Sequence, residues 1–216
     1  MLLFFTVILM AFFFVFQKPL LYVFGASDNT IGYSSTYISI YLLGTVFVEL
    51  AVGLNTFISA QGQARTAMFS VLIGAVVNIV LDPIFIFVFH MGVAGAAVAT
   101  IISQALSAAW VLRFLCSEKS GIRLKKAGMK PDFSLIGQIM ALGVSATESA
   151  ITIVMNHGLQ VYGGDLYVGS MTILQSILQL VFVPISGFTN GVQPIISYNF
   201  GAGKFDRVKM TIKRMI

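Results

Sequence analysis

The residue best placed for chemistry is Asp82, an acid inside the apolar run Met68–Phe89, MFSVLIGAVVNIVLDPIFIFVF, which contains no cation. A run of this length crosses a bilayer as a helix, for which about 20 residues suffice. A charged group near the middle of a bilayer costs roughly 2.5–3.5 kcal/mol even on lenient insertion scales, so such residues usually serve a function. Asp82 therefore indicates either a cation or proton site or a satisfied hydrogen bond between helices.

Two neighbours of Asp82 favour a cation or proton site. Asn78 lies one helical turn earlier, so the two side chains share a face of the helix. Pro83 removes one backbone hydrogen bond and leaves the carbonyl of Ile79 free near that face. A carboxylate, an amide and a free carbonyl on one stripe are groups that can bind a cation such as Na⁺ or relay a proton.

Other polar residues also lie within apolar runs. Glu49 and Asn55 share one run but sit about 240° apart around the helix, so we expect them in different environments. Asn55 could face the same cavity as Asp82. Glu49 is a second proton-titrating group, a packing partner or a buried neutral carboxyl. Thr100 belongs to a run rich in small residues, where its hydroxyl can meet a cation or another helix.

The last third of the chain adds three candidates. Glu148 lies within an apolar run with no cation beside it, which fits contact with a substrate or coupling ion, or a protonated bond between helices. Gln175 and Gln179 lie four residues apart and share a helix face. They are suited to lining a polar cavity, or equally to linking helices through their amides.

Composition excludes an ordinary soluble domain and predicts an all-α integral membrane protein. Hydrophobic residues make up 57% and charged residues only 10%, against ~25% charged in typical globular domains. Cys116 is the single cysteine, and His90 and His157 lack metal-ligand spacing, so we expect no resident metal and no cofactor. An intramembrane aspartyl protease needs two apposed aspartates, and Asp82 is alone inside a span, so we expect no enzyme.

Hydropathy divides the chain into six transmembrane helices. A linker with two glycines and a proline, Ser117–Ser134, separates residues 1–116 from residues 135–216. The expected spans are Met1–Val23, Thr36–Ser59, Thr66–Phe89, Val93–Cys116, Leu135–Val161 and Tyr167–Tyr198.

The cations predict the orientation of these spans. If six helices alternate, 12 of the 13 lysines and arginines fall on one side, in the Gln61–Arg65 turn, around the linker and after Tyr198. The positive-inside rule makes that side, and both termini, cytoplasmic in a cell membrane. The net charge of +5 then reflects topology, and we expect no nucleic-acid partner.

Two long motifs resemble the multidrug and toxic compound extrusion family of cation-coupled exporters. They are NTFISAQGQARTAMFSVLIGAVVNIVLDPIFIFVFHMGVAGAAVATIISQ and GFTNGVQPIISYNFGAGKFDRVK. The resemblance implies part of a twelve-helix, two-lobe fold. Residues 1–116 would be the last four helices of the N-lobe and 117–134 the cytoplasmic inter-lobe linker. Residues 135–216 would be the first two helices of the C-lobe and a basic cytoplasmic segment.

The resemblance also implies roles for single residues. Asn55 matches an amide of the family's N-lobe cation site, Asn78 and Asp82 match its central pair, and Thr100 matches its hydroxyl. Glu148 resembles an acid that some branches carry near a C-lobe cation site. The first helix of the N-lobe, which supplies an aspartate partner for Asp82, is absent from this chain.

The expected function is export of organic cations and drugs by Na⁺ or H⁺ antiport, from an internal fragment of such a transporter. Its partners would be the lipid bilayer and the missing transporter helices. Two alternatives are a flippase for lipid-linked oligosaccharides, which usually has a more cationic cavity, and a membrane fragment that transports nothing.

Overall fold

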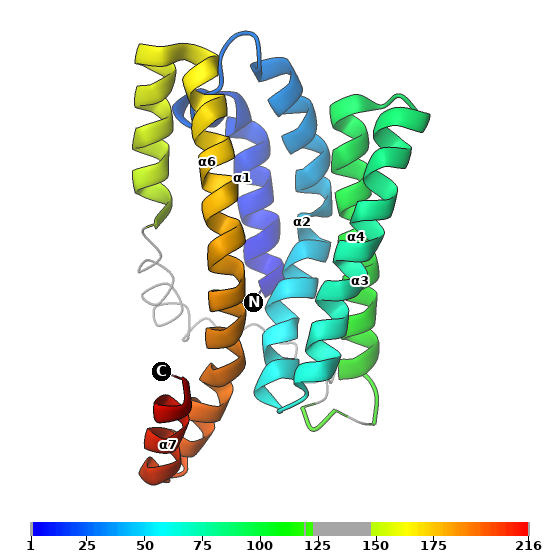
Figure 1. The fold of residues 1–216 in the computed structure, drawn as a ribbon. Helices are drawn as coiled ribbons and strands as arrows, with labels where there is room; N and C mark the ends of the chain where they lie inside the picture. The colour runs from blue at the N-terminus through cyan, green and yellow to red at the C-terminus, as the bar shows by residue number, and fades with distance from the viewer. Residues whose placement is uncertain (1, 119, 123–147, 216) are drawn as a thin grey trace.

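The computed structural model describes residues 2–118, 120–122 and 148–215. Every element in that part of the chain is a helix, which confirms the all-α fold expected from composition. In chain order the elements are α1 (Leu2–Val23), α2 (Ile31–Ala60), α3 (Ala64–Pro83), η1 (Ile84–Val88), α4 (Gly92–Leu115), α6 (Glu148–Gly201) and α7 (Phe205–Met215). Figure 1 shows long helices standing side by side, with the short α7 at one end.

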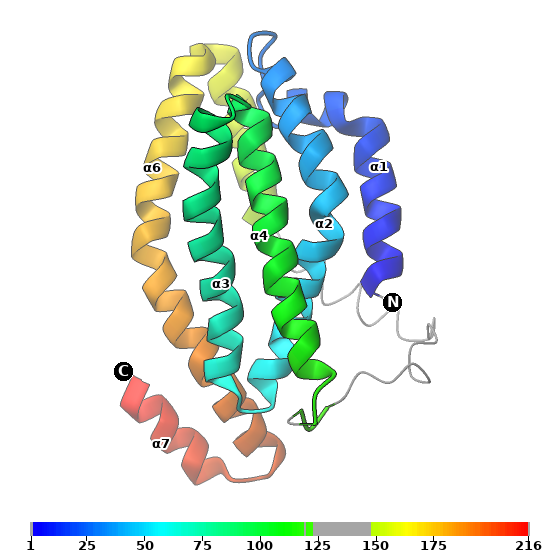
Figure 2. The ribbon, with the colours of Figure 1, turned by 90° about the vertical axis from the view of Figure 1, so that its right-hand side faces the viewer.

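Within the described residues, five helices are long and apolar enough to cross a membrane. The expected fifth and sixth spans both fall in α6, which Gly164 interrupts with φ of 65° and ψ of −164°. The chain reverses there, so α6 forms two antiparallel limbs (Figure 1, and the turned view in Figure 2). The beginning of the expected fifth span, residues 135–147, lies outside the described residues.

The start of the second span differs from the prediction. α2 begins at Ile31 and not at Thr36. The chain enters this helix through a turn in which the backbone N–H of Ser27 donates to Thr30 Oγ1 at 2.9 Å. Hydropathy missed the first turns of α2 because residues 31–35, IGYSS, are partly polar, although a helix can extend past the apolar layer of a bilayer.

The third span is not a uniform α-helix. α3 ends at Pro83 and continues as the π-helical segment η1, in which the N–H of Phe89 donates to the carbonyl of Ile84 at 3.0 Å. Proline has no N–H to donate and its ring crowds the preceding turn, so the helix is perturbed at this point. Asp82 lies at the junction of the two helical forms, and π segments are frequent at functional sites.

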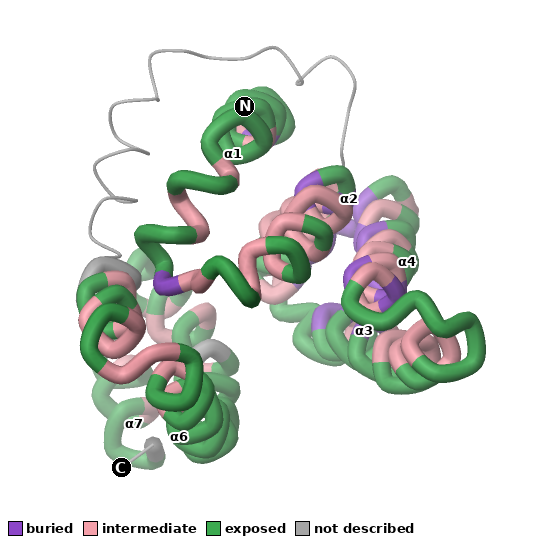
Figure 3. The backbone as a smooth tube through the Cα atoms, turned by 90° about the horizontal axis from the view of Figure 1, so that it is seen from above, coloured by how far each residue is buried: buried purple, intermediate pink, exposed green. Residues whose placement is uncertain are grey.

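α4 packs most closely against its neighbours, and Figure 3 shows buried backbone where it meets α2 and α3. Small residues at a helix interface let the backbones approach closely. Gly44 of α2 lies so near Ile101 of α4 that an added Cβ would overlap the isoleucine side chain. The buried positions of α4 are Gly95, Ala97, Ala99, Ser103, Ser107, Ala108, Val111 and Leu115.

Polar side chains also join α3 to α4. Ser107 Oγ donates to the carbonyl of Ser70 at 2.6 Å, and Trp110 Nε1 donates to the carbonyl of Thr66 at 3.1 Å. Polar groups left unpaired in hydrocarbon cost several kcal/mol. These two bonds, whose acceptors lie one helical turn apart on α3, therefore help to fix the register of α3 against α4.

The turn between α2 and α3 holds the start of the segment that follows α4. Gly62 has a φ of 77°, which glycine adopts without steric cost. The side-chain oxygen of Gln61 accepts hydrogen bonds from Ser120 Oγ at 3.1 Å and from the N–H groups of Gly121 at 2.8 Å and Ile122 at 3.2 Å. One amide oxygen thus anchors residues 120–122 to the α2–α3 turn.

The outward faces of the helices are apolar and exposed (Figure 3). Val15 on α1, Ile79 on α3 and Leu180 on α6 are each at least 70% exposed. Soluble monomers rarely expose large continuous apolar patches. The protein is a multi-pass membrane protein, and these side chains are suited to contact with lipid.

Candidate functional site

Asn78 is the centre of a hydrogen-bonded group of three side chains from two helices. Its Nδ2 donates to Asp82 Oδ1 at 3.1 Å, one turn along α3, and to Thr100 Oγ1 of α4 at 3.5 Å. Thr100 Oγ1 in turn donates to the carbonyl of Ala96 at 2.9 Å. All three side chains are half-buried. The amide thus connects the carboxylate of one helix with the hydroxyl of its neighbour.

Asn55 approaches the same region from α2. It lines the cavity that Asn78 and Thr100 also line. Its side-chain oxygen is buried and receives no hydrogen bond from any described residue. A buried acceptor left unpaired costs about 1–3 kcal/mol. A cation or a donor group that reached this oxygen would relieve that cost.

The cavity has a volume of about 970 Å³ and lies between α2, α3 and α4 on one side and the end of α6 on the other. Its polar lining consists of amides and hydroxyls, with no charged side chain among the described lining residues. Asp82 does not line it, but contacts Asn78, which does. The carboxylate therefore reaches the cavity through an amide.

The hydroxyl groups of the lining present acceptors to the cavity. Ser70 Oγ donates to the carbonyl of Ala67 at 2.9 Å, and Ser103 Oγ donates to the carbonyl of Ala99 at 2.7 Å. Ser107 and Thr100 likewise donate their protons to backbone carbonyls. A hydroxyl that has donated its one proton retains lone pairs only. The wall formed by α3 and α4 is consequently suited to cations and to ligands that carry hydrogen-bond donors.

The other predicted site residues do not join this group in the part of the chain described. Glu49 is half-buried on α2 and does not line the cavity. Gln175 is half-buried and Gln179 is exposed on the second limb of α6, and neither lines the cavity. α6 begins at Glu148, whose side chain lies outside what the structure describes.

Sequence reasoning missed the wall that α6 contributes. Gln193, Ser197 and Tyr198 line the cavity from the end of α6, and Gln104 lines it from α4. A signal was present, because Gln193 and Ser197 are polar residues one helical turn apart in a largely apolar run, the same spacing as Asn78 and Asp82. Only the fold brings that face of α6 opposite α2.

Comparisons with known proteins agree with this architecture. A family model described as MatE matches residues 1–84 and 141–216. The multidrug export protein MepA of Staphylococcus haemolyticus (strain JCSC1435) is 33% identical over 196 residues, which cover 88% of this chain and 43% of that protein. MepA of Staphylococcus aureus (strain NCTC 8325 / PS 47) is 31% identical over 206 residues, which cover 93% of this chain and 45% of that protein.

Solved structures give the same result. The MATE multidrug transporter DinF-BH, solved in complex with a rhodamine dye, superposes with a TM-score of 0.86 at 34% identity, over 97% of this chain and 49% of that one. An inward-facing MATE transporter of the MOP superfamily superposes with a TM-score of 0.78 at 22% identity, over 99% of this chain and 50% of that one, which concerns the fold alone. The chain spans about half the length of the relatives it matches.

Proposed function

This chain belongs to the MatE family, and from that premise we propose that it takes part in exporting drugs and organic cations in exchange for Na⁺ or H⁺. Its matched relatives include multidrug export proteins. Because the chain spans about half their length, the complete pathway would include helices beyond those described here. The proposed activity is transport, with no covalent chemistry and no catalytic residue.

The proposed coupling site consists of Asp82, Asn78 and Thr100, with Asn55 of α2 on the same side of the cavity. The observation that carries the proposal is the hydrogen-bonded group of Asp82, Asn78 and Thr100 inside apolar helices. Hard cations prefer oxygen ligands, and each of the four residues has a side-chain oxygen. Na⁺ would be bound by these oxygens, whereas H⁺ would be bound by the Asp82 carboxylate alone.

The cavity supports a cationic or donor-rich substrate. Its α3–α4 wall offers acceptors, and no lysine or arginine is among the described lining residues. An anionic headgroup would find no ion pair there, so the lining favours drug export over flipping of a lipid-linked oligosaccharide. Glu148 is a second candidate for cation coupling, and Glu49 for proton titration. Gln175 and Gln179 are candidates for substrate contact outside this cavity.

Exchange would operate through Asn78, which touches Asp82 and also lines the cavity. When the carboxylate binds a cation or a proton, its hydrogen bond to the Asn78 amide weakens, and the amide is free to turn toward the cavity. A ligand shifts a conformational equilibrium only by its differential affinity for the two states. Coupling therefore requires that the affinity for the ion and the affinity for the substrate both depend on the orientation of the Asn78 amide.

The test is transport of the same rhodamine dye in proteoliposomes that contain these 216 residues together with the helices that complete the proposed pathway. An inward-directed Na⁺ or H⁺ gradient should drive release of the dye with the wild-type protein. Asp82→Asn should lose the dependence on the gradient and yet retain normal amounts of folded protein, because the substitution removes a half-buried charge from between apolar helices. Asp28→Asn, which changes an exposed acid in the loop before α2, is the matched control and should transport normally.

Two results would overturn the proposal. If neither gradient moves the dye through the complete pathway, the protein does not export it in exchange for Na⁺ or H⁺. If Asp82→Asn keeps full gradient-driven transport and Glu148→Gln abolishes it, the coupling site lies at Glu148, and Asp82 has a structural hydrogen-bonding role.

A further inference from the structure

The short helix α7 has a narrow apolar stripe bordered by cations. Phe205, Val208 and Ile212 follow the spacing of three and four residues that puts side chains on one face of a helix. Phe205 is 55% exposed and Ile212 is 43% exposed, so both ends of this face are open, while Val208 between them is half-buried and the Phe205 ring packs edge-on against Phe200 of α6. An exposed apolar stripe on a strongly charged helix is typical of helices that lie at a membrane surface.

The charges of α7 and its leading residue are almost all positive. Asp206 is the only acid between residues 204 and 214, so the segment has a net charge of +4. All five cations are exposed, and they lie on both sides of the apolar stripe: Lys204, Arg207, Lys209, Lys213 and Arg214. Such a surface is complementary to a layer of phosphate groups.

The end of α6 directs α7 away from the axis of the preceding span. The N–H of Gly203 donates to the carbonyl of Phe200 at 3.0 Å, and the N–H of Lys204 donates to the carbonyl of Asn199 at 2.8 Å. With Gly203 at a φ of 68°, these two bonds form a Schellman motif, which ends a helix. Figure 2 shows α7 running obliquely across the end of α6.

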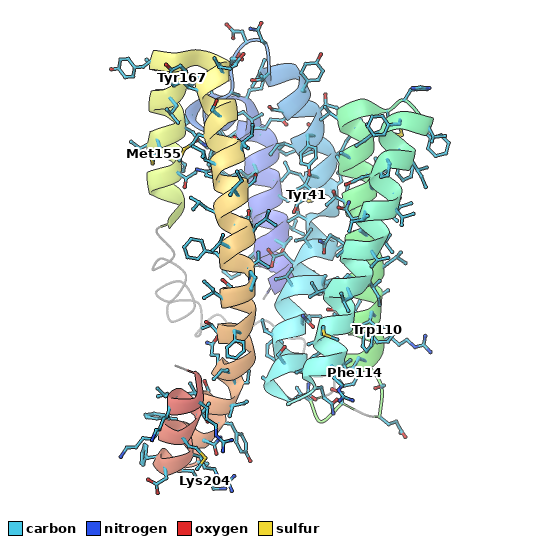
Figure 4. All side chains as sticks on the ribbon, viewed as in Figure 1. Tyr41, Trp110, Phe114, Met155, Tyr167 and Lys204 are labelled. Carbon is cyan, nitrogen blue, oxygen red and sulfur yellow. The ribbon has the colours of Figure 1, made fainter. Side chains whose placement is uncertain are left out.

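α7 lies at an end of the membrane-spanning helices, close to the surface of the bilayer that they cross. It follows the second limb of α6 after only a short turn. Figure 4 shows Lys204 at the same end of the molecule as Phe114, which is next to Arg113 in the last turn of α4. Helices that cross the bilayer therefore hold α7 close to the headgroups on this side.

We propose that α7 is an interfacial helix that binds the phosphates of anionic lipids. The apolar stripe of Phe205, Val208 and Ile212 enters the boundary between headgroups and acyl chains. The cations on its two sides meet the lipid phosphates, to which basic segments next to a membrane are attracted. This binding does not depend on the transport proposed above, and it would anchor the end of α6 to the membrane surface.

The test measures the depth of single labelled positions on α7. In a Cys116→Ser background, Ile212→Cys or Met210→Cys is labelled with bimane, and the protein is reconstituted with lipids that carry a quencher high on the acyl chain. Met210 is the matched control, because it is exposed and two residues from Ile212, about 160° away around the helix. Vesicles of phosphatidylcholine alone are compared with vesicles that also contain phosphatidylglycerol.

We expect quenching at Ile212 to exceed that at Met210 by about threefold in the anionic vesicles, as an interfacial helix requires. Quenching at Ile212 should fall by about half or more in 1 M salt, where the Debye length is ~3 Å. Lys209→Gln with Lys213→Gln should reduce it to the level seen in neutral vesicles. Arg65→Gln with Arg113→Gln, which removes two other cations, should not.

Three outcomes would overturn the proposal. Equal quenching at both positions would mean that α7 does not lie with one face in the membrane. Equal quenching in neutral and anionic vesicles would mean apolar insertion without recognition of phosphate. No quenching at either position would place α7 in water, where an acidic protein would be the better candidate partner. Unchanged thermal unfolding of each variant verifies that the fold is intact.

Discussion

Asn55 combines burial with a missing partner. The residue lines the cavity, its side-chain oxygen is buried, and no described residue donates to that oxygen. Asn78, by contrast, uses its amide protons on Asp82 and Thr100. The two asparagines that line the cavity thus differ in their hydrogen bonds. Asn55 has an unpaired acceptor that a ligand could use, whereas Asn78 already donates to Asp82 and Thr100.

Asn55→Leu should raise stability and impair transport. The substitution removes an unpaired buried acceptor, so we expect the free energy of unfolding to increase by about 1 kcal/mol. Asn78→Leu is the matched control and should lower it by a similar amount, because it leaves Asp82 without its donor. Thermal unfolding in detergent and transport of the rhodamine dye are measured on both. A less stable Asn55→Leu protein that still transports would contradict a ligand-binding role.

The sequence was sufficient to predict the neighbours of Asp82 but not the whole cavity. Asn78 and Asp82 are one turn apart on one helix, so local geometry alone brings them together. Their approach to Thr100 required the packing of α3 against α4, which the family resemblance implied. Gln193 and Ser197 could not be assigned, because no local rule states which face of α6 meets α2.

At the scale of elements, α2 and α4 pack so closely at Gly44 that there is no room for a side chain there. Gly44→Ala should lower the free energy of unfolding by about 1–3 kcal/mol, as overpacking does, because the new methyl group would overlap Ile101. Adding Ile101→Ala should recover part of that loss, since it removes the overlapping atoms. Gly32→Ala, in open space on the same helix, should instead stabilise by about 0.5–1 kcal/mol. Additive effects of Gly44→Ala and Ile101→Ala would argue against direct contact.

The side-chain oxygen of Gln61 links the α2–α3 turn to residues 120–122, which follow α4. Gln61→Ala should speed amide hydrogen exchange at Gly121 and Ile122, because both N–H groups lose their acceptor. Exchange at Ala67 should not change, since its N–H donates to the backbone carbonyl of Gln63 at 3.1 Å. Mass spectrometry of peptides that cover these residues measures the effect. Unchanged exchange at Gly121 and Ile122 would show that the amide oxygen does not hold them in solution.

The elements themselves were predicted unevenly. Within the described residues hydropathy found the spans, because a bilayer requires about 20 apolar residues for each. It missed the start of α2 at Ile31, since helix formation continues beyond the apolar layer. It also missed η1. A run of apolar side chains does not distinguish a π-helix from an α-helix, because the two differ in the number of backbone residues per turn.

For the whole molecule, the distribution of cations predicts the orientation in the membrane. In a Cys116→Ser background, Asp28→Cys should react with an impermeant maleimide added outside intact cells. Arg65→Cys should react only after the cells are permeabilised, because the positive-inside rule puts its turn in the cytoplasm. Both positions are exposed, so a failure to react reports the membrane and not burial. Labelling of both from outside would reject this topology.

The small side chains buried along α4 also determine how the molecule can change shape. Six of the eight buried residues of α4 are glycine, alanine or serine, and such small side chains lose little or no rotamer freedom on burial, so this interface holds little side-chain entropy that a motion could release or absorb. We therefore expect α2, α3 and α4 to move as one rigid body. The longer side chains of Gln193 and Tyr198 line the opposite wall, and they have alternative rotamers. Changes in the volume of the cavity should consequently arise at α6, with the three-helix wall serving as the fixed surface.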